Sequence, residues 1–96
     1  MGQLSLYDSV KYRSRTDIAA AILEISLSGA IKTKIMYKAF LSFPQLKEYL
    51  AVLVEKGLLE HDATDQQYYT TEKGKQYLKM YRDVGQIIFP HSVKKK

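Results

Sequence analysis

TKIMYKAFLSFPQLKEYLAVLVEKGLL, residues 33–59, is the stretch of sequence that decides the fold. Lys34 and Lys38 stand four residues apart on one face of its first part. The other face carries apolar residues at the three- and four-residue intervals typical of a helix: Ile35, Met36, Ala39 and Phe40. This spacing predicts a short amphipathic helix with these four side chains in a core, followed by a turn at residues 41–43.

A second helix is predicted to begin at about Phe43. Ser42 and Gln45 have the spacing of a capping box, and Pro44 is tolerated in a first turn whose amides lack intrahelical acceptors. Gly57 can adopt the left-handed conformation that closes a helix. Two helices joined by a tight turn form a helix-turn-helix, which presents its second helix to a groove. The apolar stripe predicted for this second helix is Leu46, Tyr49, Leu50, Leu53 and Val54.

The chain has 96 residues, no cysteine and a formal net charge of +5. This length allows one domain with a modest core, which oligomerisation would enlarge. The lack of cysteine excludes disulfides and thiolate metal sites. The sequence has neither the apolar stretch of a signal peptide nor the roughly 20 apolar residues that span a bilayer. We therefore expect a soluble, cytoplasmic, nucleoid-associated protein without membrane contact, cofactor or small-molecule substrate.

The charge is unevenly distributed along the chain. Residues 1–41 hold six Lys/Arg and three Asp/Glu, residues 42–71 hold two and five, and residues 72–96 hold seven and two. The three segments thus carry net charges of +3, −3 and +5. Basic charge favours a nucleic-acid partner, because neutralising phosphates releases counterions. The acidic middle segment favours a protein partner instead.

Shorter elements flank the helix-turn-helix. Residues 15–28 predict a first helix, with Ser14 and Asp17 in capping-box positions. The pair at residues 30–31 is a candidate extended piece that pairs with a later strand. Downstream, two short apolar or aromatic runs flank a segment rich in turn formers, which predicts a β-hairpin: residues 58–61 and residues 67–70.

The last helix is predicted to begin at Glu72, with Thr71 as its cap and Leu78 packed on the domain. Four apolar residues of this helix follow the four-three-four spacing of a heptad seam: Tyr77, Tyr81, Val84 and Ile88. An alternative is that this stripe covers the monomer's own core. We favour a homodimer seam, because the residues after Tyr81 extend about 10 Å past the domain at 1.5 Å per residue.

The predicted order of elements is helix, short strand, helix, helix, hairpin and helix, which is the order of a winged helix domain. The expected fold class is α+β, mostly α, with a three-helix core, a β-hairpin wing and a C-terminal dimerisation helix. The predicted divisions are a flexible arm (1–12), the domain (13–71), the C-terminal helix (72–89) and a basic tail (90–96).

Residues 13–82 resemble the small archaeal winged helix-turn-helix DNA-binding proteins, a family of basic regulators and chromatin-associated proteins. The more specific matching pieces are KTKIMYKAFLS (32–42), YLAVLVEKGLL (49–59) and YTTEKGKQYL (69–78). The resemblance implies binding to double-stranded DNA with the helix after Ser42 in the major groove. It also implies homodimerisation through the last helix.

The candidate DNA contacts lie in four parts of the chain. On the second helix, Gln45 is a candidate for pairing with adenine, Lys47 with guanine and Ser42 with a phosphate. The alternative is that Ser42 and Gln45 only cap this helix and that Lys47 is a solvated surface lysine. Candidates for contacts to the DNA backbone are spread over the preceding helix, the segment before the first helix and the wing: Lys32, Thr33, Lys34, Tyr37, Lys38, Arg13, Arg15, Thr64 and Gln66.

Catalysis finds no support in the sequence. His61 and His91 are far apart and lack the neighbours of a triad or metal site, and no glycine-rich phosphate loop occurs. Two functional classes remain. The first is a homodimeric DNA-binding protein, either a transcriptional regulator or a chromatin component. The alternative is a winged helix that serves as a protein–protein interaction module, and the fold alone does not decide between them.

Overall fold

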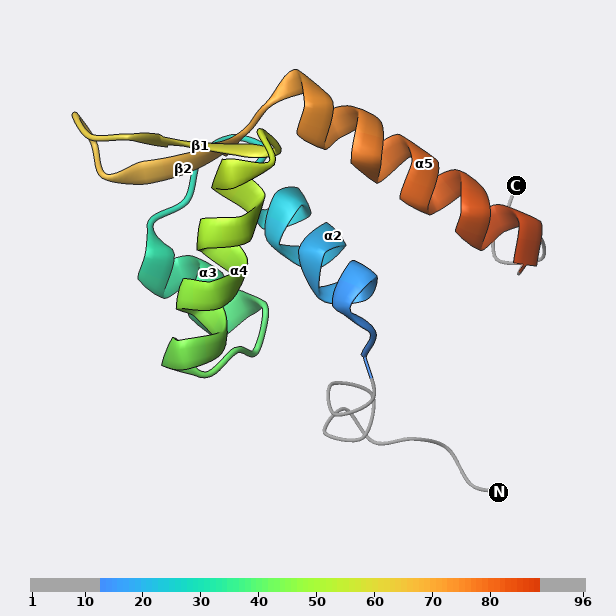
Figure 1. The fold of residues 1–96 in the computed structure, drawn as a ribbon, viewed down its shortest axis with the longest axis horizontal. Coiled ribbons are helices and arrows are strands. Elements are labelled where there is room, and N and C mark those ends of the chain that lie inside the picture. Colours follow the sequence, from blue (N-terminus) through green and yellow to red (C-terminus); the bar gives the residue numbers. More distant parts are fainter. Residues whose placement is uncertain (1–12, 89–96) are drawn as a thin grey trace.

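The computed structural model describes residues 13–88, and Figure 1 shows its elements in the predicted order. The predicted arm (1–12) and basic tail (90–96) lie outside the described residues. The architecture is a mostly helical α+β fold in which three helices form the core, a hairpin follows them and a last helix extends away, as predicted. The elements are α2 (Arg15–Ile25), α3 (Lys32–Lys38), α4 (Phe43–Glu55), β1 (Leu59–Asp62), β2 (Gln67–Thr70) and α5 (Glu72–Ile88).

Both predicted capping boxes are present. At the start of α2, the amide of Asp17 donates to Ser14 Oγ over 3.1 Å, and the Asp17 carboxylate accepts from the Ser14 amide over 3.0 Å. At the start of α4, Ser42 and Gln45 make the same reciprocal pair over 3.3 and 3.0 Å. Each box satisfies two amides that have no acceptor within the helix, which fixes where the helix begins.

The ends of α3 and α4 use one device, a left-handed residue followed by an apolar one. Gly57 has φ +79°, and the amide of Leu58 donates to the carbonyl of Leu53 over 2.9 Å, which closes α4 as predicted. At the corresponding position after α3, Phe40 has φ +58°. Its neighbour Leu41 is buried.

The prediction that Phe40 faces the core is therefore wrong. The helix ends at Lys38, and the amides of Phe40 and Leu41 donate to the carbonyls of Tyr37 and Met36 over 3.3 and 2.9 Å. The left-handed residue reverses the chain, so that Leu41 enters the core while the Phe40 side chain stays 53% exposed. Helical periodicity stops applying at the residue where the helix stops.

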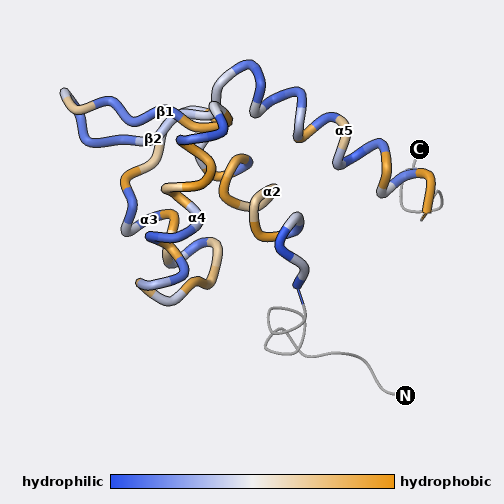
Figure 2. The backbone as a smooth tube through the Cα atoms, viewed as in Figure 1, coloured by the Kyte–Doolittle hydropathy of each residue, from blue (hydrophilic) through white to orange (hydrophobic). Residues whose placement is uncertain are grey.

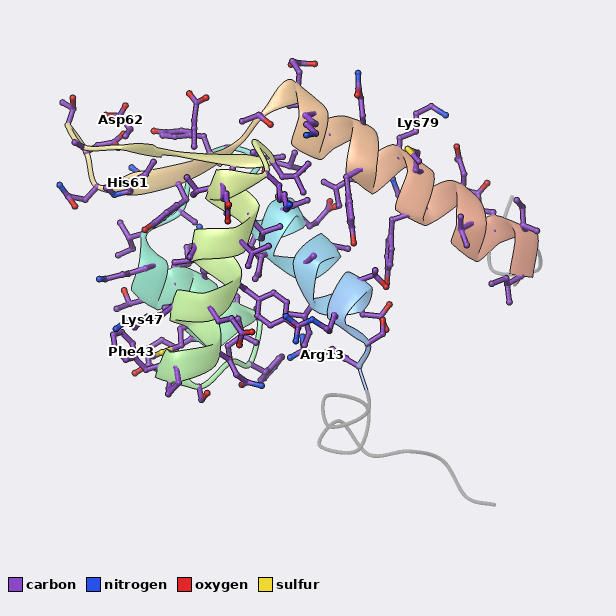
Figure 3. The ribbon with its side chains drawn as sticks, viewed as in Figure 1. Arg13, Phe43, Lys47, His61, Asp62 and Lys79 are labelled. Carbon is purple, nitrogen blue, oxygen red and sulfur yellow. The ribbon has the colours of Figure 1, made fainter. Side chains whose placement is uncertain are left out.

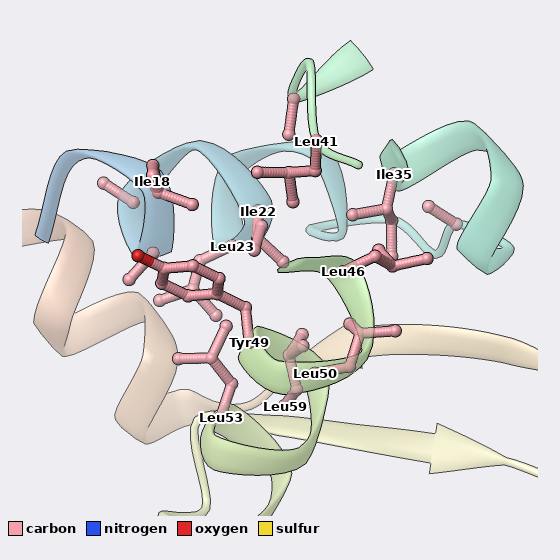
Figure 4. Packing of buried hydrophobic residues seen from close by; sticks show 14 of the residues in the cluster. Ile18, Ile22, Leu23, Ile35, Leu41, Leu46, Tyr49, Leu50, Leu53 and Leu59 are labelled. Carbon is pink, nitrogen blue, oxygen red and sulfur yellow. The ribbon is translucent and has the colours of Figure 1, made fainter. Parts of the chain in front are cut away.

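The core lies between α2, α3, α4 and the first residue of the hairpin (Figure 4). Ile22, Leu23 and Ile35 are fully buried, and four residues of the predicted α4 stripe pack against them. Val54, the fifth predicted member, is 39% exposed, because it lies at the edge of the stripe and lines a groove beside the hairpin. The amphipathic pattern thus placed α4 in the core with one error at its margin.

The hairpin pairs β1 with β2 in antiparallel register, from Leu59 opposite Thr70 to Asp62 opposite Gln67. Ala30 joins this sheet through an isolated bridge to Tyr68, with hydrogen bonds of 3.0 and 2.8 Å, which confirms the predicted extended piece before α3. Thr70 ties the hairpin to α2, because its buried hydroxyl donates to the Leu23 carbonyl over 2.6 Å. The hairpin therefore has a fixed position beside α4.

Helix α5 is capped by Thr71 as predicted, whose hydroxyl accepts from the Gly74 amide over 3.1 Å. Leu78 is buried against the domain, also as predicted. Gly74 lies against the chain that leads into β1, which leaves no room for a side chain. Beyond this contact α5 runs past α2 and away from the other elements (Figure 1), and apolar residues recur along it to the end of the described chain (Figure 2).

Candidate nucleic-acid interface

Four exposed lysines lie on α3 and the first turns of α4: Lys32, Lys34, Lys38 and Lys47. No aspartate or glutamate occurs in the sequence between Glu24 and Glu48. Residues 32–47, which we call the helix-turn-helix tip, therefore present positive charge without a carboxylate of their own. Thr33 and Tyr37 are exposed on α3 among these lysines. The tip joins the predicted phosphate contacts of α3 to the predicted base contacts of α4.

The predicted base-reading residues differ in availability. The amide oxygen of Gln45 accepts from the Ser42 amide, and Ser42 Oγ accepts from the Gln45 amide, so both side chains hold the start of α4. A two-bond contact from Gln45 to adenine would need that oxygen and hence an opened cap. Lys47 is exposed and places Nζ 5.6 Å from the ring centroid of Phe43 (Figure 3).

The two arginines predicted as contacts to the DNA backbone, Arg13 and Arg15, make contacts inside the domain. Arg13 lies beside the end of α3 and donates from Nη2 to the carbonyls of Ala39 and Phe40 over 2.6 and 3.3 Å. A cation at a helix C-terminus also interacts favourably with the helix dipole. Arg15 forms an ion pair with Glu48 over 3.3 Å and lies 5.2 Å from the ring centroid of Tyr49. Arg13 thus holds the turn after α3, and Arg15 contacts α4 just beyond the tip, which are roles that sequence spacing did not suggest.

The wing carries its acidic residues for local reasons. Asp62 accepts from the Thr64 amide over 2.8 Å, and Asp65 accepts from the Gln67 amide over 3.0 Å. The Tyr69 hydroxyl donates to Asp65 over 2.6 Å, and this bond lowers the pKa of Asp65 and raises that of Tyr69. Among the predicted wing contacts, Thr64 is exposed at the turn, whereas Gln66 donates its side-chain amide to the Ala63 carbonyl. The carboxylates of Asp62 and Asp65 therefore stabilise the turn on which Thr64 and Gln66 lie.

A groove of about 440 Å³ separates α4 from the hairpin. Lys32 and Lys47 line it from the tip, and His61 and Tyr68 line it from the wing. The two wing rings lie 4.6 Å apart between centroids. Neither residue was singled out from the sequence as a contact, because their shared position becomes visible only when the strand register is known. The tip and the wing therefore face each other across this groove and share one surface.

Helix α5 is fastened to α2 by two of the four predicted seam residues. The Tyr77 hydroxyl donates to the Thr16 carbonyl over 2.9 Å, and the Tyr81 hydroxyl donates to the Asp17 carboxylate. The two rings stack with centroids 6.4 Å apart. These two tyrosines therefore contact α2 of their own chain. The other two residues of the predicted seam, Val84 and Ile88, are 54% and 60% exposed.

We expect the Tyr81→Phe variant to lose stability mainly at neutral pH. The Tyr81 hydrogen bond lowers the pKa of Asp17 from 3.8 and, together with burial, raises the pKa of Tyr81 to about 12. A lowered carboxyl pKa stabilises the fold above pH 3.8 and is lost as pH falls, whereas the raised tyrosine pKa stabilises it up to pH 10 and is lost as pH rises toward 12. At pH 7 the loss should be about 1 kcal/mol, because the site is accessible to solvent.

Urea unfolding of both proteins at pH 7 and pH 3 measures this difference in the free energy of unfolding. The gap between wild type and variant should shrink at pH 3. Tyr37→Phe is the matched control, since its side chain is 72% exposed and should leave the pH profile unchanged. A gap that stays constant across pH would contradict the Tyr81–Asp17 linkage.

The chain is similar to known proteins in its fold. Residues 12–89 match the family model described as winged helix-turn-helix. The crystal structure of Sso10a-2, a DNA-binding protein from Sulfolobus solfataricus, is similar with a TM-score of 0.66 and 20% sequence identity, over 88% of this chain and 100% of that one. No curated protein matches significantly. Within residues 13–88, no helix is long and apolar enough to cross a membrane.

Proposed function

This chain belongs to the winged helix-turn-helix family, and from that premise we propose that it binds double-stranded DNA through the helix-turn-helix tip. The observation that carries the proposal is the set of four exposed lysines on a surface whose own sequence has no carboxylate. Its fold is that of Sso10a-2, which is itself a DNA-binding protein. We further propose that it acts in the cytoplasm on the nucleoid, as a transcriptional regulator or chromatin component of an archaeal cell.

In this proposal the N-terminal end of α4 enters the major groove. Lys47 then reaches a guanine edge, while Lys34, Lys38, Thr33 and Tyr37 lie along the phosphates beside it. Glu48 does not oppose this approach strongly, because its charge is balanced by Arg15. Thr64 and Gln66 meet the next stretch of backbone from the wing. Ser42 and Gln45 keep the start of α4 rigid and are the second choice for direct base contacts.

The Lys34→Ala/Lys38→Ala variant should bind duplex DNA more weakly and with a smaller dependence on salt. Each phosphate contact contributes about 0.9 to the slope of log K against log salt, so the slope should fall by roughly two units. Fluorescence anisotropy of a labelled duplex, titrated at several salt concentrations, measures both quantities.

Lys75→Ala/Lys79→Ala is the charge-matched control, since it removes two exposed lysines from α5 instead. Its slope should stay close to that of the wild type. If the two double variants behave alike, the tip is not the principal phosphate contact. Absence of duplex binding by the wild type at low salt would reject DNA binding and leave the alternative function, a protein-interaction module, which the −3 charge of residues 42–71 favours.

We also propose that the protein is a homodimer joined along α5. Apolar side chains on the exposed side of this helix have no cover among the described residues: Met80, Val84, Ile87 and Ile88 are 66%, 54%, 78% and 60% exposed. An open groove of about 890 Å³ runs along the junction of α5 and α2 and includes Val84 and Ile88 in its walls. A second copy of α5 laid in this groove would bury these side chains and place two tips on one DNA molecule.

A further inference from the structure

Three aromatic side chains are exposed within seven residues at the helix-turn-helix tip. Tyr37 is 72% exposed, Phe40 53% and Phe43 52%. They lie at the end of α3, in the turn and at the start of α4, and Figure 3 shows Phe43 at the end of α4 that is remote from α5. Neither phosphate contacts nor hydrogen bonds to base edges require exposed rings in these positions. The rings therefore need an explanation beyond the proposed duplex contacts.

Phe40 is held at an energetic cost. Its left-handed backbone, at φ +58°, is strained for any residue with a large side chain, and glycine is the usual choice there. The chain uses glycine at the corresponding position after α4, where Gly57 has φ +79° and ends the helix through the same pair of hydrogen bonds. Strain of this kind concentrates at functional sites, and here it keeps a ring at the surface.

The surrounding charge indicates what the rings contact. Residues 25–47 hold four lysines and no aspartate or glutamate, and Lys47 Nζ lies 5.6 Å from the ring centroid of Phe43. A surface that interleaves aromatic rings with lysines suits a polyanion whose own rings are accessible. Unpaired nucleotides have both properties, since every base has a face for stacking and each linkage carries a phosphate.

We propose that the helix-turn-helix tip binds unpaired DNA bases by stacking them on Tyr37, Phe40 and Phe43, with the tip lysines on the adjoining phosphates; this inference rests on the proposed DNA-binding function. Within a duplex both faces of each base are covered by its neighbours, so these rings can stack only on bases that are unpaired. The protein therefore binds single-stranded or locally opened DNA more tightly than its phosphate contacts alone would allow.

The test compares full-length wild type with the Phe40→Ala/Phe43→Ala variant, which leaves the proposed duplex contact Tyr37 in place, on a labelled 20-nucleotide thymidine oligomer and on a labelled 20-base-pair duplex at one salt concentration. The variant should bind the oligomer about tenfold more weakly and the duplex within about twofold of the wild type. Phe40→Leu/Phe43→Leu should resemble the alanine variant, because it keeps apolar area and removes the rings. Val52→Ala removes part of an exposed side chain elsewhere on α4 and should leave both affinities unchanged.

A Phe43→Trp variant gives a direct signal, because the chain contains no other tryptophan. Its fluorescence should be quenched by the oligomer and much less by the duplex. Normal duplex binding together with an oligomer affinity that the alanine variant leaves unchanged would overturn this inference and leave the proposed function standing. If the wild type binds neither DNA, both the proposed DNA-binding function and this inference are overturned. Oligomer binding without quenching would show that the residue at position 43 does not stack on bases.

Discussion

The Gly74→Ala variant should be destabilised by about 2 kcal/mol, because α5 could no longer approach the start of the hairpin. A Cβ at this position would lie 2.6 Å from Thr70 Cγ2 and closer still to the carbonyl oxygen of Leu58. The Leu58 carbonyl belongs to the backbone and accepts a hydrogen bond of 3.0 Å from the Thr71 amide, so it cannot move without loss. Overpacking of this kind costs about 1–3 kcal/mol, of which the gain in helix propensity from alanine offsets only part.

The same helix supplies a control of opposite sign. Gly85 has nothing within 4 Å of a Cβ, so Gly85→Ala should raise the free energy of unfolding by about 0.5–1 kcal/mol through helix propensity alone. Urea unfolding of the three proteins is compared at concentrations low enough to keep each a monomer, since Gly85 lines the groove proposed for a second copy of α5 and dimerisation would add its own term. Equal effects at the two glycines would mean that Gly74 is not a close-packing position.

The Val84→Gln/Ile88→Gln variant should be a monomer at concentrations where the wild type is a dimer. Glutamine has a higher helix propensity than valine or isoleucine and keeps the charge of α5, but it removes two exposed apolar side chains from the proposed seam. A symmetric dimer contains four such side chains, and losing about 1 kcal/mol at each weakens association by about 4 kcal/mol, or roughly a thousandfold. Sedimentation equilibrium measures the change.

Gln86→Ala is the control for this experiment, because Gln86 is exposed on α5 and lies outside the predicted stripe. It should leave the dissociation constant unchanged. A wild-type protein that remains monomeric at high concentration would contradict the proposed dimer directly. If the double variant and the wild type share the same mass as dimers, the interface lies elsewhere on the molecule.

Much of the fold could be predicted from short-range patterns. Ser42 and Gln45 predict the start of α4, Gly57 predicts its end, and Thr71 predicts the start of α5. These helix-capping signals can be read from the sequence because each depends on hydrogen bonds within about five residues or on a local backbone conformation. Phe40 marks where this reasoning failed. The helical period of α3 predicts that Phe40 faces the core, but Phe40 has a left-handed backbone conformation and lies beyond the end of the helix.

The roles of the charged residues were less predictable. Arg13 and Arg15 are predicted as contacts to the DNA backbone, yet the structure pairs them with partners 26 and 33 residues away, at Ala39 and Glu48. Asp62 and Asp65 contribute to the −3 charge of residues 42–71, although each accepts a hydrogen bond from the wing's own backbone. The net charge of a segment therefore overestimates how many basic side chains are available to DNA. It also does not reveal that the acidic side chains stabilise the wing turn.

The sequence by itself determined the helix-turn-helix, its caps, the hairpin and the basic character of residues 25–47, because these depend on spacing and on nearest neighbours. Only the tertiary structure decided which side chains are free to meet a partner. Tyr77 and Tyr81 are held by residues of α2 more than 60 positions away, whereas Val84 and Ile88, in the same stripe, remain uncovered. Periodicity assigns a residue to a helix face, but packing determines what lies opposite that face, and packing is set by contacts between distant parts of the chain.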